Sequence, residues 1–480
     1  METKFLDVYN THMKLYPYTK DDLPILEAEY TATDKFSGND FICGYMIEDA
    51  IMYLPRGTSI SKIEGLLNIQ ANYINDPDPK EPMSIQHRNL YDLRSELQEK
   101  SVEFLMGERN SQLGLNLGGG QGKSFCVAYA STELREKTII ITHTTGIKKQ
   151  WINKTYFEMF DYRHSTLLNI DGSQIMESIM KDNVEPADVY FVNHQTLRSY
   201  MTRHGGHALH RFFKKLKVGI KVYDEAHLEF ANILLVDFFT NTERTWYLSA
   251  TFDRSDNTES VCFRRAFSSV ATFGEEETKE VEPKHVVYHV VNFNSRATPK
   301  QKAKVAGFTG GNGVSYGKYA FLENPNQTAY KVLQTILEKI RDVEGKVLIL
   351  VPLIEIVDQL THSLSLDFPE KRVAAYHSRI DKSEKDAAIQ RDIIVSTIKS
   401  CGTGRDIPEL RTVINFEPFA SKKVLAKQIF WRLRPYPDGK LTYFFDAIDV
   451  SIPFCNWWFK SRFKEIKNLA HSVVYLNLDS

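Results

Sequence analysis

The chain has 480 residues, of which 42% are hydrophobic and 25% are charged, and its formal net charge is −1. These values are typical of a globular protein with two to four domains, and the balanced charge neither favours nor excludes a nucleic-acid partner. Five scattered cysteines without C-x-x-C or Cys/His metal spacing argue against a disulfide framework or a zinc site. An N-terminus without an apolar core, and the lack of a run of about 18 apolar residues, predict a cytoplasmic protein with no membrane span.

The first 80 residues predict a small accessory α/β domain. Within it, FICGYMIEDAIMYLPRG (41–57) contains one or two short elements and a Pro55-Arg56-Gly57 turn. MSIQHRNLYDLRSEL (83–97) predicts an amphipathic helix that opens with Gln86. A first large α/β domain is then expected over residues 81–275.

A glycine-rich turn follows a short predicted strand at 112–117 and precedes a predicted helix at 124–134. The stretch NLGGGQGKSF (116–125) ends in Gly122-Lys123-Ser124, as a phosphate-binding loop does. Backbone N–H groups of Gly120, Gln121 and Gly122 would face the phosphates of a nucleotide. Lys123 would reach the β- and γ-phosphates and Ser124 would ligate Mg²⁺. A chance glycine turn is the alternative, because Leu117 stands where G-x-x-x-x-G-K-[ST] has its first glycine.

The stretch KVGIKVYDEAH (217–227) predicts a buried strand that ends in two carboxylates, Asp224 and Glu225. The carboxyl end of a strand is where an α/β sheet places its ligand chemistry. Asp224 would hold Mg²⁺ through its water shell, and Glu225 would orient and deprotonate the attacking water. Alone, these residues could be an acidic helix start. A phosphate loop about a hundred residues upstream favours the nucleotide site.

The second half of the chain begins after an acidic stretch, 273–283, that predicts a linker. A second large α/β domain is expected over residues 284–455, followed by a C-terminal helical extension at 456–480. Near its start, the segment 295–321 carries Lys300 and Lys302 together with Phe308 and Tyr316. Basic side chains bind phosphates and aromatic ones stack on bases, so this insertion is either a nucleic-acid contact or a solvated loop.

Several stretches in fixed order resemble the motifs of superfamily 2 helicases. They are ITHTTGIKKQW (141–151), VNHQTL (192–197), YDEAH (223–227), LSAT (248–251), AAYHS (374–378), STIKSCGTGRDIP (396–408) and QIFWRLRP (428–435). The resemblance covers roughly residues 82–450. It implies two RecA-like parallel-sheet motor domains preceded by the small N-terminal α/β domain, with ATP and Mg²⁺ as cofactors. In this family the first loop position is often apolar, which accounts for Leu117.

The resemblance also assigns roles to residues outside the two nucleotide motifs. Gln86 would read the adenine edge. The remaining nucleotide contacts would be Gly404, Asp406 and Gln428; coupling residues would be His227, Ser249 and Thr251; and nucleic-acid contacts would be Thr142, His143, Thr144, Gln195 and Thr397. The arginine that neutralises charge on the γ-phosphate would be Arg432 or Arg434. Which of the two acts stays open, because Trp431 replaces the glycine of the family pattern.

Within the superfamily, the chain is most similar to the compact phage and viral type, with UvsW-like and RecG-like branch-migration helicases. That type implies a monomeric, DNA-stimulated ATPase that translocates on DNA and unwinds or migrates forked and four-way junctions. An RNA-directed or transcript-releasing motor is the first alternative. The motor subunit of a restriction system is the second, and it would need a separate nuclease partner.

Overall fold

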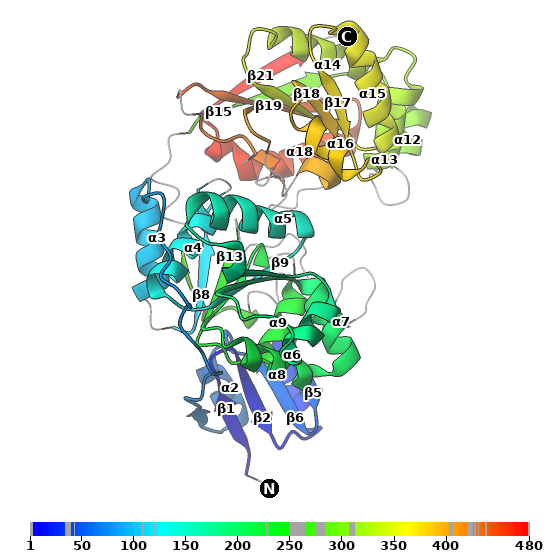
Figure 1. The fold of residues 1–480 in the computed structure, drawn as a ribbon. Coiled ribbons are helices and arrows are strands. Elements are labelled where there is room, and N and C mark those ends of the chain that lie inside the picture. Colours follow the sequence, from blue (N-terminus) through cyan, green and yellow to red (C-terminus); the bar gives the residue numbers. More distant parts are fainter. Residues whose placement is uncertain are drawn as a thin grey trace. The chain divides into compact units, whose positions relative to one another are not determined.

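A computed structural model describes the chain in a series of segments. They are residues 3–33, 40–42, 44–107, 110–118, 121–226, 229–249, 265–274, 284–306, 313–402, 407–419, 426, 429–430, 432–436 and 439–478. Contacts within the chain separate two units, Met1–Val281 and Glu282–Ser480. The first unit contains two sheets of five and seven strands and a two-stranded ribbon, and the second contains one sheet of seven strands (Figure 1).

The N-terminal part of the first unit is a small mixed sheet with two helices. Its elements are β1 (Phe5–Val8), β2 (His12–Tyr16), α1 (Asp22–Tyr30), β3 (Thr31–Thr33), β4 (Asp40–Ile42), β5 (Met46–Glu48), β6 (Ile51–Pro55), α2 (Ile60–Leu67) and β7 (Ala71–Tyr73). The sheet order is β5-β6-β2-β1-β7, antiparallel except for the β1–β7 pair. Alternate residues of β1 and β2, such as Leu6 and Leu15, are fully buried, as expected for a sheet covered on one face. This arrangement agrees with the predicted small α/β domain.

The seven-stranded sheet of the first unit follows. Its elements are α3 (Glu96–Gly107), β8 (Gln112–Asn116), α4 (Lys123–Leu134), β9 (Thr138–Thr142), α5 (Thr145–Gln150), η1 (Trp151–Phe157), η2 (His164–Thr166), β10 (Leu167–Ile170), α6 (Ser173–Met180), β11 (Val189–Asn193), α7 (His194–His204), α8 (Gly206–Leu216), β12 (Ile220–Tyr223), α9 (Phe230–Phe238), β13 (Arg244–Ser249) and β14 (Ala271–Phe273). The strand order is β10-β11-β9-β12-β13-β8-β14, and every pair is parallel.

Continuous apolar runs form the central strands of this sheet because helices cover both faces. Strands β8, β9 and β12 are buried at every position. Helices α3 and α4 and the π-helix η1 contribute to the apolar core on one face, and α6, α7, α8 and α9 contribute to the core on the other (Figure 1). Since all strands are parallel, their carboxyl ends meet at one edge, and the predicted motifs follow these ends.

The small N-terminal sheet is hydrogen-bonded to the seven-stranded sheet of the first unit, here called the motor sheet. The bonds lie at the opposite edge of that sheet, where its strands begin. Ser111, directly before β8, donates to the Asn10 carbonyl at 2.8 Å. The Asn10 amide donates to the Asn241 side chain at 2.9 Å, and the Asp78 carboxylate accepts from the Asn241 amide at 2.7 Å. Tyr53 of β6 packs in the same apolar core as α8 and α9. The two parts therefore form one unit.

The prediction of a helix over residues 83–97 is wrong, because the helix begins only at Glu96. The preceding segment is instead tied to neighbouring elements through its backbone and side chains. Buried Asp188 accepts from the Ser84 amide at 2.6 Å, and the His87 Nε2 lies 2.9 Å from its carboxylate. The Leu90 amide donates to the Met159 carbonyl at 3.0 Å. These bonds use amide groups that a helix would have needed for itself.

The second unit has the same architecture as the motor sheet of the first. Its elements are β15 (Val286–Phe293), α12 (Pro299–Ala306), α13 (Gly313–Gly317), η4 (Lys318–Glu323), α14 (Thr328–Lys339), β16 (Lys346–Leu350), α15 (Ile354–Asp367), β17 (Val373–Tyr376), α16 (Lys382–Ala388), β18 (Ile393–Ser396), η5 (Ile398–Gly402), β19 (Leu410–Asn415), β20 (Thr442–Asp449), α18 (Pro453–Ile466), η6 (Lys467–Leu469) and β21 (Ser472–Leu478). The order is β17-β18-β16-β19-β20-β15-β21, again with parallel pairs. The predicted parallel α/β architecture is confirmed for both sheets.

The end of the chain differs from the helical extension expected at 456–480. Helix α18 begins at Pro453, and its buried Arg462 donates to Asp446 on β20 at 2.8 and 2.9 Å. The chain then adds β21 as an edge strand parallel to β15. The segment 472–478 is rich in β-branched and aromatic residues, which suit a half-exposed strand. Both elements therefore belong to the second sheet layer rather than to an appendage.

The predicted insertion at 295–321 is partly built into the core of the second unit. Tyr316 on α13 is 2% exposed, and its ring meets the Phe454 ring edge-on with centroids 6.3 Å apart. Tyr319 is likewise buried and donates to the Ser295 carbonyl at 3.3 Å. The proposed stacking of Tyr316 on bases is therefore wrong, because packing against α18 removes its ring from solvent.

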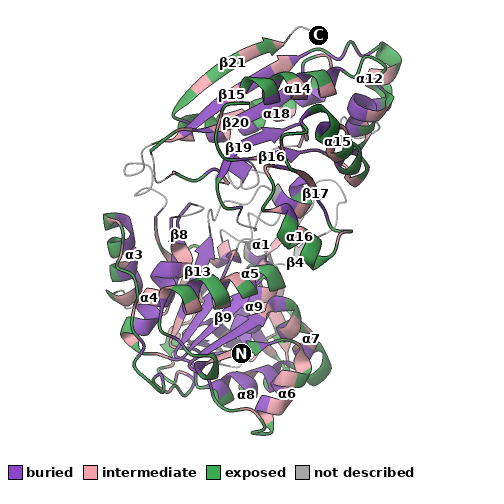
Figure 2. Cartoon of the chain, turned by 45° about the horizontal axis from the view of Figure 1, so that its top comes forward, coloured by how far each residue is buried: buried purple, intermediate pink, exposed green. Residues whose placement is uncertain are grey.

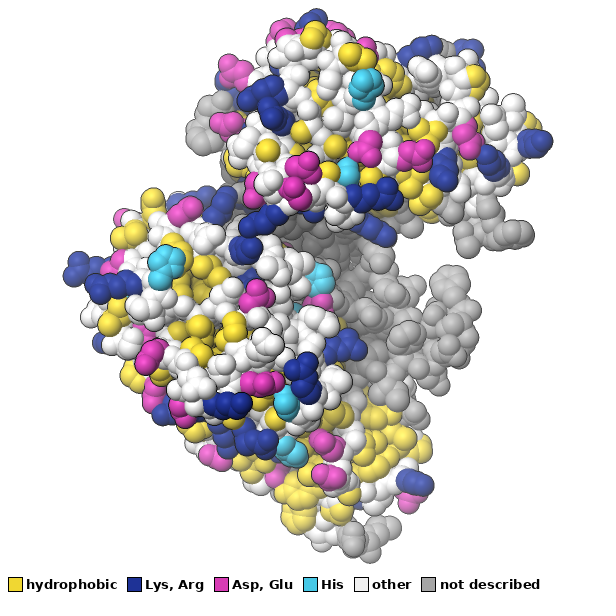
Figure 3. Space-filling model, turned by 45° about the vertical axis from the view of Figure 1, so that its right-hand side comes forward, with side chains coloured by type: hydrophobic (Ala, Val, Ile, Leu, Met, Phe, Trp, Pro, Cys, Tyr) yellow, Lys and Arg dark blue, Asp and Glu magenta, His cyan; other side chains and the backbone are white. Residues whose placement is uncertain are grey.

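The surface carries side chains of both charges. Buried residues concentrate in the strands, and the outward faces of the helices are exposed (Figure 2). On the face drawn in Figure 3, basic and acidic side chains are interspersed, in keeping with the small net charge. None of the helices in the described segments combines the length and the hydropathy that a membrane-spanning helix needs.

Candidate nucleotide-binding site

The glycine-rich turn lies between β8 and α4, as the sequence predicts. Gly122 immediately precedes the helix with φ of +91°, a left-handed conformation that glycine adopts without strain. The Lys123 ammonium donates to the Leu117 carbonyl at 2.5 Å and to the Gly118 carbonyl at 3.2 Å. The lysine therefore lies against its own loop, at the N-terminus of a twelve-residue helix whose amides face outward. Ser124 follows it in the first turn, half-buried.

Gln98, not Gln86, is the glutamine that contacts this loop. Gln98 on α3 is 2% exposed, and its Nε2 donates to the Gln121 carbonyl at 3.1 Å. Its Oε1 accepts from the Arg94 amide at 3.0 Å. A Cβ at Gly122 would lie 2.3 Å from the same Nε2, so the amide packs directly on the turn. Gln86 is exposed in the segment before α3.

The two carboxylates follow β12, two strands away from the loop strand β8 in the sheet. The Asp224 amide donates to the Ile141 carbonyl at 2.9 Å, which extends the β9–β12 ladder to the site. Asp224 Oδ1 accepts from the Glu225 amide at 3.0 Å, and Oδ2 accepts from the Trp151 indole at 2.6 Å. Glu225 has φ of +50°, a conformation that costs energy for a residue with a Cβ and is concentrated at functional sites.

Burial disfavours ionisation of both carboxyls. Burial raises the pKa of Asp224 to about 6, with a further increase from the negative charge of Glu225. The pKa of Glu225 is also raised by burial. The positive charge of the Lys123 ammonium lowers both pKa values. Two buried carboxylates near one lysine form a site that a divalent cation would complete.

The motif at the end of β9 connects to this site through charged side chains. His143 forms an ion pair with Glu229, and this hydrogen bond raises the pKa of the imidazole. Thr144 is exposed and caps α5 by accepting from the Ile147 amide at 3.3 Å. Thr142 is fully buried and donates to Asn193 at 2.9 Å. Its predicted contact with nucleic acid is therefore wrong, because its hydroxyl joins two strand ends inside the protein.

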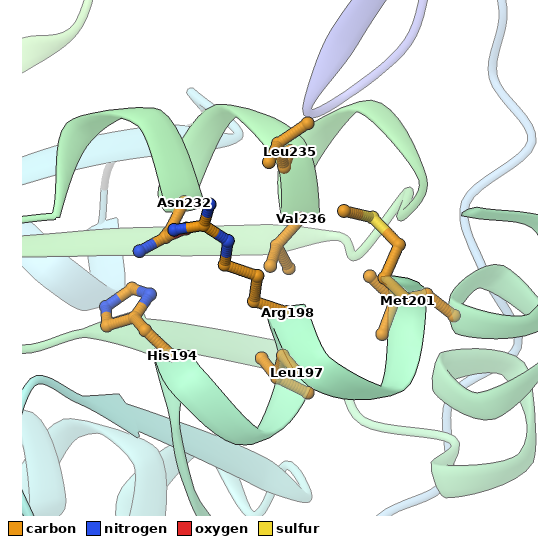
Figure 4. Close-up of a pocket in the computed structure, with 8 residues that line it drawn as sticks. His194, Leu197, Arg198, Met201, Asn232, Leu235 and Val236 are labelled. Atoms are coloured by element: carbon orange, nitrogen blue, oxygen red, sulfur yellow. The ribbon is translucent and has the colours of Figure 1, made fainter. Parts of the chain in front are cut away.

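A small cavity lies between α7 and α9, next to the Gln195 segment. It is lined by His194, Leu197, Arg198, Met201, Leu209, Asn232, Leu235 and Val236, with polar side chains on one side and aliphatic ones on the other (Figure 4). Its volume of about 10 Å³ is enough for one water molecule and far too small for a nucleotide. Gln195 itself is exposed at the start of α7.

The other predicted site residues differ in how much surface they offer. Ser249 is fully buried at the end of β13, between the loop strand and the carboxylate strand. In the second unit, Thr397 is buried and donates to Ser400 at 3.0 Å. Arg432 is half-buried, with its guanidinium 4.0 Å from the Cys401 sulfur, and Arg434 is exposed.

The basic residues of the insertion lie on α12. Lys300 is exposed and Lys302 is half-buried. Seven predicted site residues lie outside the described residues, namely Gly120, His227, Thr251, Phe308, Gly404, Asp406 and Gln428. Their roles stay predictions.

The sequence pattern missed two residues of this site, Gln98 and Trp151. Gln98 carries no local signal, because its burial depends on where α3 begins and how it packs. Trp151 carries no local signal for its bond, because its acceptor is 73 residues away. Only the packing of η1 against the end of β12 brings the two together.

Two family models match the sequence. The model described as Type III restriction enzyme, res subunit, matches residues 80–254, and the model described as Helicase conserved C-terminal domain matches residues 328–432. Together they cover more than half of the chain, one in each unit. A comparison with curated proteins finds no match.

Solved structures share the fold. S. cerevisiae Dbp5 bound to RNA and ADP BeF3 superposes with a TM-score of 0.52 and 15% identity over 80% of this chain and 90% of that chain. The ATP-dependent Type ISP restriction-modification enzyme LlaBIII bound to DNA gives 0.54 and 13% over 82% of this chain, which spans 32% of that larger chain. The crystal structure of T4 UvsW matches over 99% of both chains at 15% identity, with a TM-score of 0.37. The first two likenesses agree with two RecA-like lobes.

Proposed function

This chain belongs to superfamily 2 of the helicases, and we propose that it is an ATP-driven DNA motor that unwinds or branch-migrates forked and four-way junctions. The observation that supports ATP hydrolysis is the placement of Lys123, Asp224 and Glu225 at the same edge of the first seven-stranded sheet. The charge of the lysine lowers the pKa of both carboxyls. Lys123 begins the helix that follows β8, and the two carboxylates directly follow the parallel strand β12. This is the arrangement that nucleotide hydrolysis requires.

The donor set fits ATP with Mg²⁺. The Ser124 hydroxyl and the Asp224 carboxylate offer the hard oxygen ligands that Mg²⁺ prefers, in part through water. Lys123 would exchange its loop carbonyls for the β- and γ-phosphates, and the amides at the start of α4 would face them. Bound Mg²⁺ would neutralise phosphate charge. Glu225 would orient the attacking water and accept its proton, a role helped by a raised pKa.

Several further roles complete the proposal. Arg432, with Arg434 as the alternative, would neutralise charge on the γ-phosphate during hydrolysis. Exposed Thr144 and Gln195 at adjacent strand ends, together with His143, would hold a nucleic-acid backbone. Lys300 and Lys302 would add phosphate contacts in the second unit. Ser249, between the loop strand and the carboxylate strand, would couple the nucleotide to these contacts.

We propose DNA rather than RNA as the substrate. An RNA-directed motor and a restriction motor are the two alternatives that the experiment below distinguishes. Dbp5 is bound to RNA in its structure, whereas LlaBIII is bound to DNA. The match of residues 80–254 to a restriction-enzyme subunit favours a restriction motor as the second candidate. That candidate would act on plain duplex DNA rather than on branches.

The test is the ATPase rate measured in parallel with single-stranded DNA, duplex, fork, four-way junction and RNA. We expect the greatest stimulation and strand separation with forks and four-way junctions. Glu225→Gln should lower turnover by about 10²-fold or more while DNA binding remains. Preference for RNA, or for unbranched duplex without strand separation, would reject the junction motor in favour of the corresponding alternative.

A further inference from the structure

Trp151, the first residue of η1, contacts the carboxylate that is expected to hold Mg²⁺. Its indole N–H donates to Asp224 Oδ2 at 2.6 Å, and both side chains are buried, at 1% and 7% exposure. The other oxygen, Oδ1, accepts from the Glu225 amide at 3.0 Å. An ionised carboxylate has about four lone-pair sites, so two remain for the water shell of a cation. The indole therefore orients the carboxylate without blocking it.

The position of Trp151 in the chain makes this bond a connection between two functions. Strand β9 ends at Thr142, the proposed nucleic-acid contacts His143 and Thr144 follow, and α5 runs directly into the π-helix that Trp151 begins. The same strand also holds Asp224 by its backbone, through the Ile141 carbonyl. The stretch 141–151 thus touches Asp224 at both ends. A shift of the residues between those ends would therefore move the Asp224 carboxylate. Turns of π-helix, such as the one that Trp151 begins, are frequent at functional sites.

Aromatic packing holds the indole in place. Trp151 lies in the core on the α3, α4 side of the sheet, with Tyr156, Phe160, Tyr162 and Phe191. Its ring centroid is 6.3 Å from that of Tyr156, which is itself fully buried. In a close-packed core the ring cannot turn to another acceptor without displacing its neighbours. The N–H therefore stays aimed at Asp224 unless the segment moves.

A second buried tryptophan shows that the bond is not a general need of this core. Trp246 on β13 is fully buried, and among the described residues its indole N–H has no hydrogen-bond partner. Trp246 makes ring contacts only. The Trp151 N–H also donates to a carboxylate, and hydrogen bonds to charged acceptors are the stronger class.

We propose that Trp151 is a positioning residue that couples nucleic-acid contact at the end of β9 to the orientation of Asp224. When nucleic acid binds His143 and Thr144, the start of η1 moves and the indole moves with it. The indole then orients the Asp224 carboxylate toward the Mg²⁺-bound nucleotide. The inference rests on the proposed motor function, because it presupposes that nucleic acid stimulates hydrolysis.

The test compares Trp151→Phe with Trp246→Phe, since both remove an indole from the same core but only the first removes a hydrogen bond. We expect Trp151→Phe to lower the DNA-stimulated kcat about tenfold or more. The affinity for DNA should change little, and the ratio of the DNA-stimulated to the unstimulated rate should fall. Trp246→Phe should keep its stimulation. Equal stimulation of Trp151→Phe and wild type would overturn the proposal.

A second measurement does not depend on the folding of Trp151→Phe. A variant that retains Trp151 and replaces Trp246, Trp431, Trp457 and Trp458 by Phe reports on this indole alone. Saturating single-stranded DNA without nucleotide should change its emission. Unchanged emission in a variant that still binds DNA would overturn the coupling. A wild-type protein without any nucleic-acid-stimulated ATPase would instead contradict the proposed function.

Discussion

Replacing Gln98 by Ala should weaken nucleotide binding, whereas replacing Gln86 by Ala should not. Gln98 supports the phosphate loop from behind, through the Gln121 carbonyl at 3.1 Å and the Arg94 amide at 3.0 Å. Ala at this position removes both bonds and leaves the buried Gln121 carbonyl without the partner that it has in the native protein. Gln86 is exposed, so its truncation leaves no buried group unpaired.

The size of the effect follows from the unpaired carbonyl. A buried polar group that loses its partner costs about 1–3 kcal/mol. If the loop must adopt this conformation to bind phosphates, the same free energy appears as roughly 5- to 150-fold weaker binding of Mg²⁺-ATP. Part of it can appear as lower stability of the first unit, because the bonds also exist without nucleotide. Gln86→Ala should stay within about twofold, as surface substitutions do.

Titration of each variant with a fluorescent ATP analogue, together with thermal unfolding, separates these contributions. We expect the dissociation constant to increase for Gln98→Ala, with a modest decrease in melting temperature. The reasoning would be refuted if Gln98→Ala bound nucleotide like wild type while Gln86→Ala bound it weakly. Gln86 would then be the nucleotide contact, as the sequence pattern predicted.

Two other predictions concern pH and stability. Because burial raises the pKa of Asp224 to about 6, and a protonated carboxyl no longer attracts the cation, kcat/KM for ATP should decrease as the pH falls through about 6; a profile that is flat from about pH 5 to 8 would contradict this. Arg462→Ala leaves the Asp446 charge buried without its bidentate partner, which should cost about 3–5 kcal/mol and lower the melting temperature of the second unit by roughly 6–20 °C. Arg372→Ala, which breaks a surface pair, is the matched control, and equal melting temperatures for the two variants would show that the buried pair does not stabilise the sheet.

The sequence by itself determined the two parallel sheets and the place of the nucleotide site. Central strands of a parallel sheet are covered on both faces, so they appear as short apolar runs such as β9 and β12. The residues directly after such runs lie at one edge of the sheet whatever the loops do. The positions of Lys123, Asp224 and Glu225 at that edge therefore follow from the amino-acid sequence, because their chemistry depends on local sequence and on strand direction.

The tertiary structure decided which side chains reach that site and which are taken up by the core. Gln98 rather than Gln86 meets the loop because Asp188, about a hundred residues further on, holds the segment before α3 in a non-helical path. Tyr316 packs under α18 although its sequence context is basic and glycine-rich. Trp151 reaches Asp224 across 73 residues of sequence. Each of these outcomes depends on a hydrogen bond or ring contact with a distant partner, and local periodicity contains no information about such partners.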